Sequence, residues 1–265
     1  MIPSPKPSRD LAAIGSVGLI AAVMVLAQVA EGGHVRALLQ PTAALVVFGG
    51  SAAALLLSFP LAQLRRTATA VGKAFRRIPK QDRALVARFE QYAVRVRRRG
   101  PAALEPEITA VDDPFLSRAL GLVVDGVDAH EIRRALTTFN RAAEEADEES
   151  AVVLETAAGY APTLGILGAV LGLIRVMENL ATPAAVGAGI AVAFVATVYG
   201  VGSANLVLLP LASRLRALSR QSAVERELIT EGAVVLQKAL HPRIVEAHLG
   251  GFIRQQPSRT KEGAA

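Results

Sequence analysis

Four long stretches without acidic residues or lysine dominate this sequence. A helix needs roughly 20 apolar residues to cross the hydrocarbon core of a bilayer. Four segments reach that length: Leu11–Ala30, Gln40–Leu61, Ala157–Val176 and Ala184–Leu211. Arg175, near the end of the third segment, is the only charged residue in any of them. The sequence therefore predicts an all-α fold, a polytopic membrane protein with four transmembrane helices.

The distribution of charge predicts the orientation of these helices. The formal net charge is +6, and most Lys and Arg residues lie between the second and third segments or after the fourth. Positive residues concentrate on the cytoplasmic side of membrane proteins, so both termini and the long middle segment are expected to be cytoplasmic. The middle segment carries almost as many acidic as basic residues, which argues against a nucleic-acid partner.

The layout predicts five regions along the chain. A cytoplasmic N-terminus (1–10) precedes helices one and two (11–61), a helical cytoplasmic domain (62–150), helices three and four (151–211) and a cytoplasmic tail (212–265). The first apolar segment is expected to remain in the mature protein, because it lacks an A-x-A-like cleavage site and a second apolar segment follows closely.

Periodicity and capping patterns predict helices in the middle domain. Leu85, Phe89, Tyr92 and Val96 recur at helical steps within 83–99. The motif "DDPF" and the pair of Asp128 and Glu131 are typical helix starts. The second of these helices meets no breaker before the third apolar segment, "HPR" (His241–Arg243) divides the tail into two helices, and no strand is expected.

Small residues form one face on each of the last two membrane helices. The third helix carries Ala161, Gly165, Gly168 and Gly172 at three- and four-residue spacing, and the fourth carries Gly189, Ala193, Thr197, Gly200 and Ala204. Such faces let membrane helices approach closely. Two interpretations remain open: the faces pack helices together, or they surround a partner helix or a narrow water path.

Two prolines interrupt the same helices near their predicted cytoplasmic ends. Pro162 and Pro210 each remove one backbone hydrogen bond, which leaves the carbonyls of Ala158 and Leu206 without their usual donors. The pair is interpreted as matched hinges at one membrane level, or as simple kinks.

The membrane helices lack the groups that relay protons. Proton carriers use carboxylates or histidines within the bilayer, whereas Glu155 and Glu178 only flank the third helix. If the chain conducts ions, a partner must supply the carboxylate.

Several long motifs resemble the A subunit of the bacterial flagellar stator, the MotA/PomA family. They are "RRRGPAALE", "DDPFLSRALGLVVDGVD", "YAPTLGILGAVLGLI", "VAFVATVYGVGSANLVLLP" and "EGAVVLQKALHPRIVE". The order of the motifs and the arrangement of two helices, loop and two helices also agree. The resemblance runs from about Arg97 to the "PRIVEAHL" segment near His248, and the first hundred residues match mainly in layout.

The resemblance implies a multi-pass protein of the bacterial inner membrane in which five A subunits ring two B subunits. Each B subunit has one membrane span with an ion-binding Asp, and a peptidoglycan-binding domain. Ion flow through this channel drives torque on a rotor switch-complex protein; membrane lipid is the other expected partner. The implied channel lining is Gly165, Gly168, Ala169, Gly172, Ala193, Thr197 and Gly200. The family's two functional prolines map onto Pro162 and Pro210.

The family's rotor-facing charges map onto Arg97, Arg98 and Glu105. A further acidic position next to the last is Pro106 here, so this part of the pattern is missing. Without the family, these basic residues have a plainer explanation as a solvated or lipid-touching surface. The charged run Arg141–Ser150 is also interpreted as a solvated helix face.

The third helix predicts which ion is used. Sodium-driven members carry Thr where this sequence has Ala169, and tend to have a second Thr at Ala196, beside Thr197. Hard cations need oxygen ligands, and a methyl group offers none. The sequence therefore predicts proton coupling.

Three other kinds of protein are alternatives to a stator subunit. The TolQ/ExbB energisers also ring a partner helix, but they have one span before the cytoplasmic domain, where this chain has two. A self-contained channel conflicts with the absence of intramembrane charge. An enzyme conflicts with four scattered His residues, no Cys and no phosphate loop, so no catalytic residue, metal or cofactor is expected.

Overall fold

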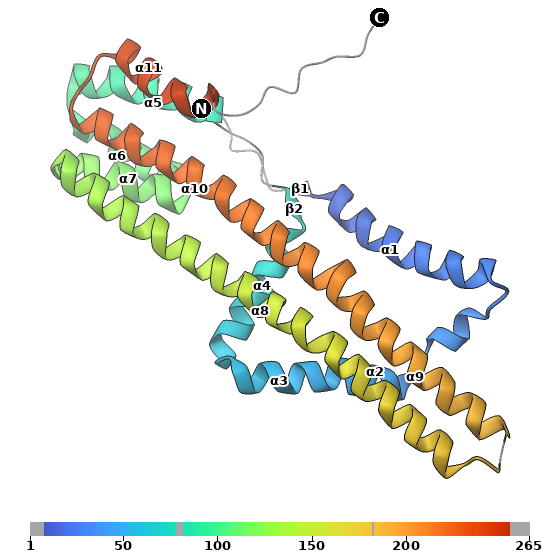
Figure 1. Cartoon of the computed structure of the whole chain (residues 1–265). Helices are drawn as coiled ribbons and strands as arrows, with labels where there is room; N and C mark the ends of the chain where they lie inside the picture. The colour runs from blue at the N-terminus through green and yellow to red at the C-terminus, as the bar shows by residue number, and fades with distance from the viewer. Residues whose placement is uncertain (1–7, 78–81, 182, 255–265) are drawn as a thin grey trace, which may run out of the picture. The chain divides into compact units, whose positions relative to one another are not determined.

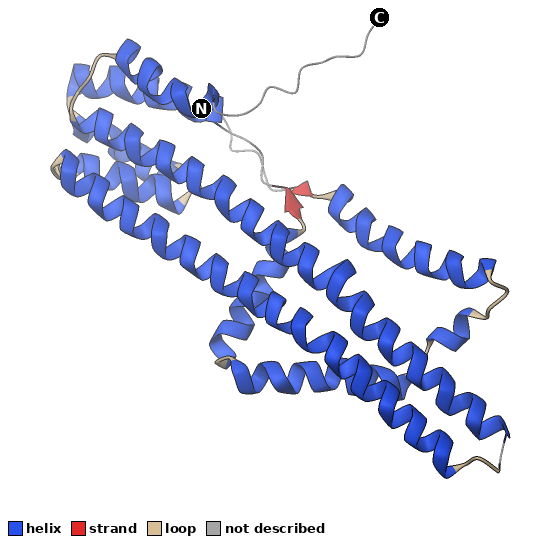
Figure 2. Ribbon diagram, in the orientation of Figure 1, coloured by secondary structure: helices blue, strands red, loops and turns tan. Residues whose placement is uncertain are grey.

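The computed structural model describes residues 8–77, 82–181 and 183–254, and it is helical almost throughout (Figures 1 and 2). The helices fall into two compact units. The membrane unit comprises residues 8–77 and 146–218, and the head unit comprises the described parts of 78–145 and 219–265. The all-α fold predicted from the sequence is confirmed. The head unit joins most of the predicted middle domain to most of the predicted tail, and the exact domain boundaries stay a prediction.

The membrane unit contains the apolar helices. Helix α1 (Leu11–Ala30) is followed by the short η1 (Val35–Leu38). The second apolar segment forms α2 (Pro41–Ala44), the π-turn η2 (Leu45–Gly49) and α3 (Gly50–Ser58). It ends at Ser58, three residues earlier than predicted, because Phe59 adopts the extended backbone that a following proline favours. Helix α4 (Leu61–Ala74) follows.

The last two apolar segments belong to much longer helices. Helix α8 (Ala129–Glu178) runs without interruption from the head unit through Pro162, as predicted. After it come α9 (Pro183–Ser203), the π-turn η4 (Ala204–Leu208) and α10 (Leu209–Gln237). Among the described residues, four helical segments are long and apolar enough to cross a membrane. They contain the first and third predicted spans in full, the second as far as Ser58 and the fourth from Val186.

The head unit packs around one hydrophobic core. It contains α5 (Asp82–Arg99), η3 (Pro101–Leu104), α6 (Glu105–Ala110), α7 (Pro114–Val124) and α11 (Pro242–Arg254), with the adjoining parts of α8 and α10. The periodic residues Leu85, Phe89, Tyr92 and Val96 are all buried in this core, which confirms the helix predicted there.

The predicted helix starts of the head unit are also observed. The Asp113 carboxylate accepts a hydrogen bond from the backbone N–H of Phe115, and Asp128 does the same for His130, each at 2.8 Å. These side chains satisfy donors that a helix N-terminus leaves unpaired. Helix α10 ends at Gln237 and α11 begins at Pro242, so the predicted division at "HPR" is confirmed.

The prediction of no strand was wrong in one detail. Strands β1 (Ser8–Arg9) and β2 (Arg76–Arg77) pair antiparallel, and Asp10 N–H continues the pairing to the carbonyl of Phe75 at 2.9 Å (Figure 2). Two residues are too few for the alternating pattern by which strands are predicted. This pairing attaches the start of α1 to the end of α4.

Candidate functional site

Helices α8 and α9 lie side by side through their small-residue faces (Figure 1). A methyl group added to Gly165 would lie 2.9 Å from the Ala196 carbonyl oxygen, and one added to Gly200 would lie 2.5 Å from that of Ala161. One on Gly172 would lie 2.8 Å from the Gly189 carbonyl oxygen. These glycines therefore bring the two backbones into direct contact, which is the packing use of small residues in membranes.

This contact changes the expected lining of a channel. Five of the seven predicted lining residues are buried within this one chain, mostly in the contact between α8 and α9: Gly165, Gly168, Gly172, Ala193 and Gly200. Their side of each helix is packed against the neighbouring helix of the same chain. Of the other two predicted lining residues, Thr197 is exposed and Ala169 is half-buried. The channel lining stays a prediction.

The opposite faces of these helices are exposed and apolar. The exposed side chains are Ile166, Leu167, Val170, Leu173 and Ile174 on α8 and Ile190, Phe194, Val198 and Val201 on α9. Thr197 lies among the latter, and its hydroxyl donates to the Ala193 carbonyl at 3.3 Å. A surface this apolar requires lipid or another protein to cover it.

The two prolines are accommodated differently. Helix α8 stays regular through Pro162. Pro210 instead follows the π-turn η4, which widens the helix over the residues that include Leu206. A π-turn is one way in which a helix absorbs a missing hydrogen bond. The sequence predicted two equivalent prolines, but the backbone is irregular only before Pro210.

A cavity of about 280 Å³ lies beside Pro210, between the start of α1 and the start of α10. Its walls are largely apolar and include Ala13, Val17, Phe75, Leu206, Pro210 and Arg214. The helix at Pro210 therefore has open space on its α1 side.

Two tyrosines hold the second apolar segment against the last two. The Tyr199 hydroxyl on α9 donates to the Leu38 carbonyl and accepts from the Gln40 N–H at 3.4 Å. At the other end, the Tyr160 hydroxyl on α8 lies 2.8 Å from the Ser58 hydroxyl. The second segment is thus hydrogen-bonded at both ends, although no sequence pattern predicts these pairings.

Arg214 joins α10 to α1 and α4. Its guanidinium donates to the Asp10 carboxylate at 2.5 Å and to the Ala74 carbonyl at 2.7 Å. Asp10 also caps α1 by accepting from the N–H groups of Ala12 and Ala13. The hydrogen bond from Arg214, followed by the one from Ala13, lowers the pKa of Asp10 below its ordinary value. This anchor is therefore fully charged at neutral pH, and only acid can protonate it.

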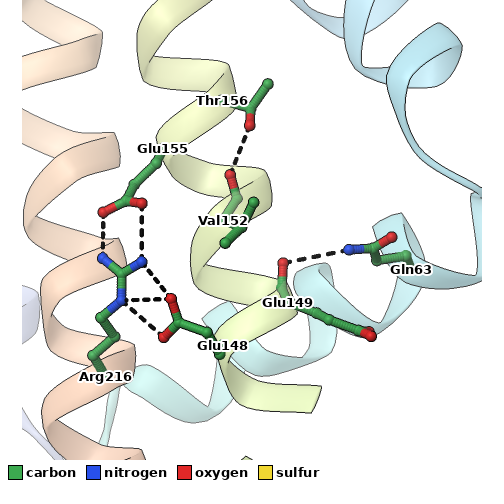
Figure 3. Close-up of polar contacts among 7 residues, drawn as sticks. All are labelled: Gln63, Glu148, Glu149, Val152, Glu155, Thr156 and Arg216. Atoms are coloured by element: carbon green, nitrogen blue, oxygen red, sulfur yellow. Dashed lines mark hydrogen bonds and ion pairs between the residues drawn. The ribbon is translucent and has the colours of Figure 1, made fainter. Parts of the chain in front are cut away.

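Arg216 joins α10 to α8 (Figure 3). Its Nε donates to Glu148 at 2.9 Å, and its Nη2 donates to Glu148 at 2.6 Å and to Glu155 at 2.9 Å. Its Nη1 donates to the other Glu155 oxygen. The hydrogen bond from Arg216 lowers the pKa of Glu155, and hydrogen bonds to Glu148 and then Glu155 raise the pKa of Arg216.

The run Arg141–Ser150 is therefore not solvated throughout. Arg141 and Glu145 are exposed and pair with each other, as on a solvated face. Glu148 instead binds Arg216, and the Glu149 carbonyl accepts from Gln63 of α4 (Figure 3). The prediction is wrong for this last part of the run, because no sequence period shows which acidic residue faces a neighbouring helix.

The predicted rotor-facing charges lie on an exposed corner of the head unit. Arg97 and Arg98 are in the last turn of α5, and Glu105 begins α6. Gly100, at φ +77°, ends α5 in the left-handed conformation that glycine tolerates. All three charged side chains are exposed. The nearby Glu107 is different, since it binds Arg95 at 2.5 Å and accepts from the Tyr92 hydroxyl at 3.1 Å.

Within the described part of the chain, no three His, Asp or Glu side chains lie close enough together to hold a metal ion.

Comparison with known proteins identifies the architecture. Residues 107–228 match the MotA/TolQ/ExbB proton channel family, and residues 13–91 match the motility protein A N-terminal family. Motility protein A of Bacillus subtilis (strain 168) is 33% identical over 240 residues, which cover 88% of this chain and 87% of that protein. The chain belongs to the MotA/PomA family of flagellar stator A subunits.

Further relatives agree with this assignment. The chemotaxis protein PomA of Vibrio alginolyticus is 29% identical over 245 residues, covering 92% of this chain and 94% of that protein. The structure of C. jejuni MotAB matches with a TM-score of 0.86 and 27% identity, over 96% of this chain and 100% of that chain. The match over residues 13–91 takes in the first two apolar segments, so the chain groups with MotA/PomA and not with TolQ/ExbB.

Proposed function

We propose that this chain forms, with a single-span B subunit, a proton channel whose flow drives torque on the flagellar rotor. The observation that carries the proposal is the contrast within the membrane unit. Its apolar segments contain no Asp, Glu, Lys or His, yet two of them present a long exposed apolar surface. A proton path through the bilayer needs a titratable group, so a partner helix with its own carboxylate must contribute one.

The proposed assembly is five copies of this chain around two B subunits. Solved relatives are MotAB complexes, which supports a B partner for this chain as well. The exposed faces of α8 and α9 are proposed to meet the B helices and the neighbouring copies. The buried glycines then act indirectly, because they let α8 and α9 form a thin wall between the B helices and the outer helices.

Thr197 and Ala169 are the proposed lining residues nearest to the ion. Thr197 is exposed and carries a hydroxyl, whereas Ala169 is half-buried and carries none. Ala196 is fully buried, so its side chain is not available as a ligand position. Sodium is bound by several oxygen ligands, and each copy of this chain offers one side-chain hydroxyl, Thr197, at these positions. This supports proton coupling.

Torque is proposed to leave the chain through the head unit. A charged surface of the rotor switch complex would contact Arg97, Arg98 and Glu105. The two helices would bend at Pro162 and Pro210 when the partner's carboxylate changes charge. We also propose that the chain lies in the bacterial inner membrane, where anionic lipid is a further partner, and that both termini are in the cytoplasm. The concentration of basic residues outside the apolar segments supports this orientation.

Complementation tests the proposal. The gene is expressed with the gene for its B partner in a host that lacks stators, and swimming is tracked. We expect the pair to restore swimming, and the same pair with the B subunit's membrane Asp replaced by Asn to restore none. Swimming that persists after this replacement would contradict the proposed role of the partner carboxylate.

A further inference from the structure

Arg216 binds two carboxylates that lie two turns apart on α8. Glu148 and Glu155 are seven residues apart, which places them on the same side of the helix. The guanidinium lies between them and donates to both oxygens of each (Figure 3). A planar guanidinium that binds two carboxylates in this way fixes direction as well as distance. We call this cluster of Arg216, Glu148 and Glu155 the arginine clamp.

The position of the arginine clamp relates it to the prolines. Glu155 lies seven residues before Pro162, and Arg216 lies six residues after Pro210. The two helices run in opposite directions, so the residues before Pro162 and the residues after Pro210 lie toward the same end of the pair. The clamp joins the helices at that end. Beneath the clamp, Ala151 and Leu154 of α8 pack with Ala212 and Leu215 of α10 in a buried cluster. This contact consists of small and flexible side chains, whereas the clamp supplies the directional tie.

The other side of α10 is held by Arg214. Two residues along a helix correspond to a rotation of about 200°, so Arg214 and Arg216 point to nearly opposite sides. Arg214 holds the Asp10 carboxylate and the Ala74 carbonyl, and Arg216 holds α8. Helix α10 is therefore bound on two opposite sides, through Arg214 and Arg216, within about two turns of Pro210.

We propose that Arg216 is a positioning residue for torque generation. The arginine clamp makes the segment of α8 before Pro162 and the segment of α10 after Pro210 move as one body. Without it, the apolar contact of Ala151 and Leu154 with Ala212 and Leu215 is left to couple the two segments near their prolines, and less of a bend started by the ion leaves the membrane unit. The inference rests on the proposed stator function and adds a residue that the small-residue faces and prolines do not predict.

A distance measurement tests the coupling directly. The chain has no Cys, so spin labels can be attached through Val152→Cys on α8 and Ala217→Cys on α10, both at exposed positions. The labelled chain is purified with its B partner, and the distribution of label distances is measured by pulsed electron paramagnetic resonance. We expect a narrow distribution for the native clamp and a distribution at least twice as wide for Arg216→Gln.

The matched control is Arg220→Gln, which removes the same charge from an exposed position one turn further along α10. It should leave the distribution narrow. A narrow distribution for Arg216→Gln, or an equal broadening for both variants, overturns the proposal.

Motor output provides the second readout. In stator-less cells expressing the A and B pair, Arg216→Gln should lower the torque of tethered cells at least fivefold, while the amount of B subunit that co-purifies stays unchanged. Glu148→Gln and Glu155→Gln should each lower torque partially, since one carboxylate remains. The double variant should match Arg216→Gln, and adding Arg216→Gln to it should change nothing further.

Arg216→Lys decides the outcome if Arg216→Gln fails to assemble. The lysine keeps the charge but lacks the planar fork that binds both oxygens of each carboxylate, so we expect assembled complexes with about half the native torque. Native torque from this variant overturns the arginine clamp. The native chain is the reference in every experiment. If it fails to restore swimming, the proposed stator function is contradicted. If the native chain restores swimming and Arg216→Gln has the same torque, only the role of the clamp is contradicted.

Discussion

At the scale of single residues, glycine decides how close two membrane helices come. The spacing of Gly165, Gly172 and Gly200 predicted a face of minimal bulk, and the structure shows backbone contact there. The sequence did not decide which helix would use the face. A small-residue stripe has the same pattern whether it meets a helix of its own chain or of a partner, and only the three-dimensional arrangement separates the two.

Gly200→Ala tests this contact. The added methyl group would lie 2.5 Å from the Ala161 carbonyl oxygen, so α8 and α9 must separate. We expect the variant to lose about 1–3 kcal/mol of stability, as overpacked cores do, measured as a lower midpoint of thermal aggregation of the purified A and B complex. Gly202→Ala, two residues away with open space around it, is the control and should behave like the native chain. Equal midpoints for both variants would contradict the packing role.

The exposed charges of the head unit call for a different test. Attraction between charged surfaces is additive and is screened by salt, so single neutralisations of Arg97 or Glu105 should weaken torque only in part. Reversing both, with Arg97→Glu and Glu105→Arg, should reduce swimming more than either neutralisation while membrane insertion stays intact. Reversing the exposed pair Arg141 and Glu145 instead should have little effect. Normal swimming after the first double reversal removes these residues from the mechanism.

At the scale of helices, most starts and ends were predictable and the irregular turns were not. Asp113 before Pro114 and Asp128 before Ala129 are strong local signals, and both caps are observed. The π-turns η2 and η4 left no comparable sign. Pro210 accounts for an irregularity before it, but a proline alone does not predict a π-turn, since α8 stays regular through Pro162. Which side chains of distant helices meet is not visible in a short sequence window. The anchors at Asp10, Glu148 and Glu155 were missed for the same reason.

The two prolines should therefore differ in effect. Pro210→Ala restores an N–H donor and allows η4 to tighten into a regular helix, whereas α8 is already regular through Pro162. We expect both alanine variants to assemble with the B partner and to give poor torque, with the larger loss for Pro210→Ala. Torque of tethered cells and co-purification of the B subunit measure the two effects separately. If either variant fails to assemble, that proline is structural and not a hinge.

At the scale of the whole molecule, the chain divides its tasks between two units. The membrane unit presents a slender, apolar pair of helices, and the head unit presents exposed charge around an apolar core. The four spans and the helical middle segment followed from apolar length and periodicity. The pairing of the tail with the middle domain did not, because it depends on contacts between residues more than 100 positions apart.

The identity of the driving ion tests the account most directly. The measurement is swimming speed in cells that depend on this chain and its B partner alone, first with sodium removed and then with the proton gradient collapsed by an uncoupler. Since Ala169 offers no oxygen and Thr197 only one, we expect swimming to continue at native speed without sodium and to stop with the uncoupler. Swimming that survives the uncoupler and stops when sodium is removed would contradict proton coupling.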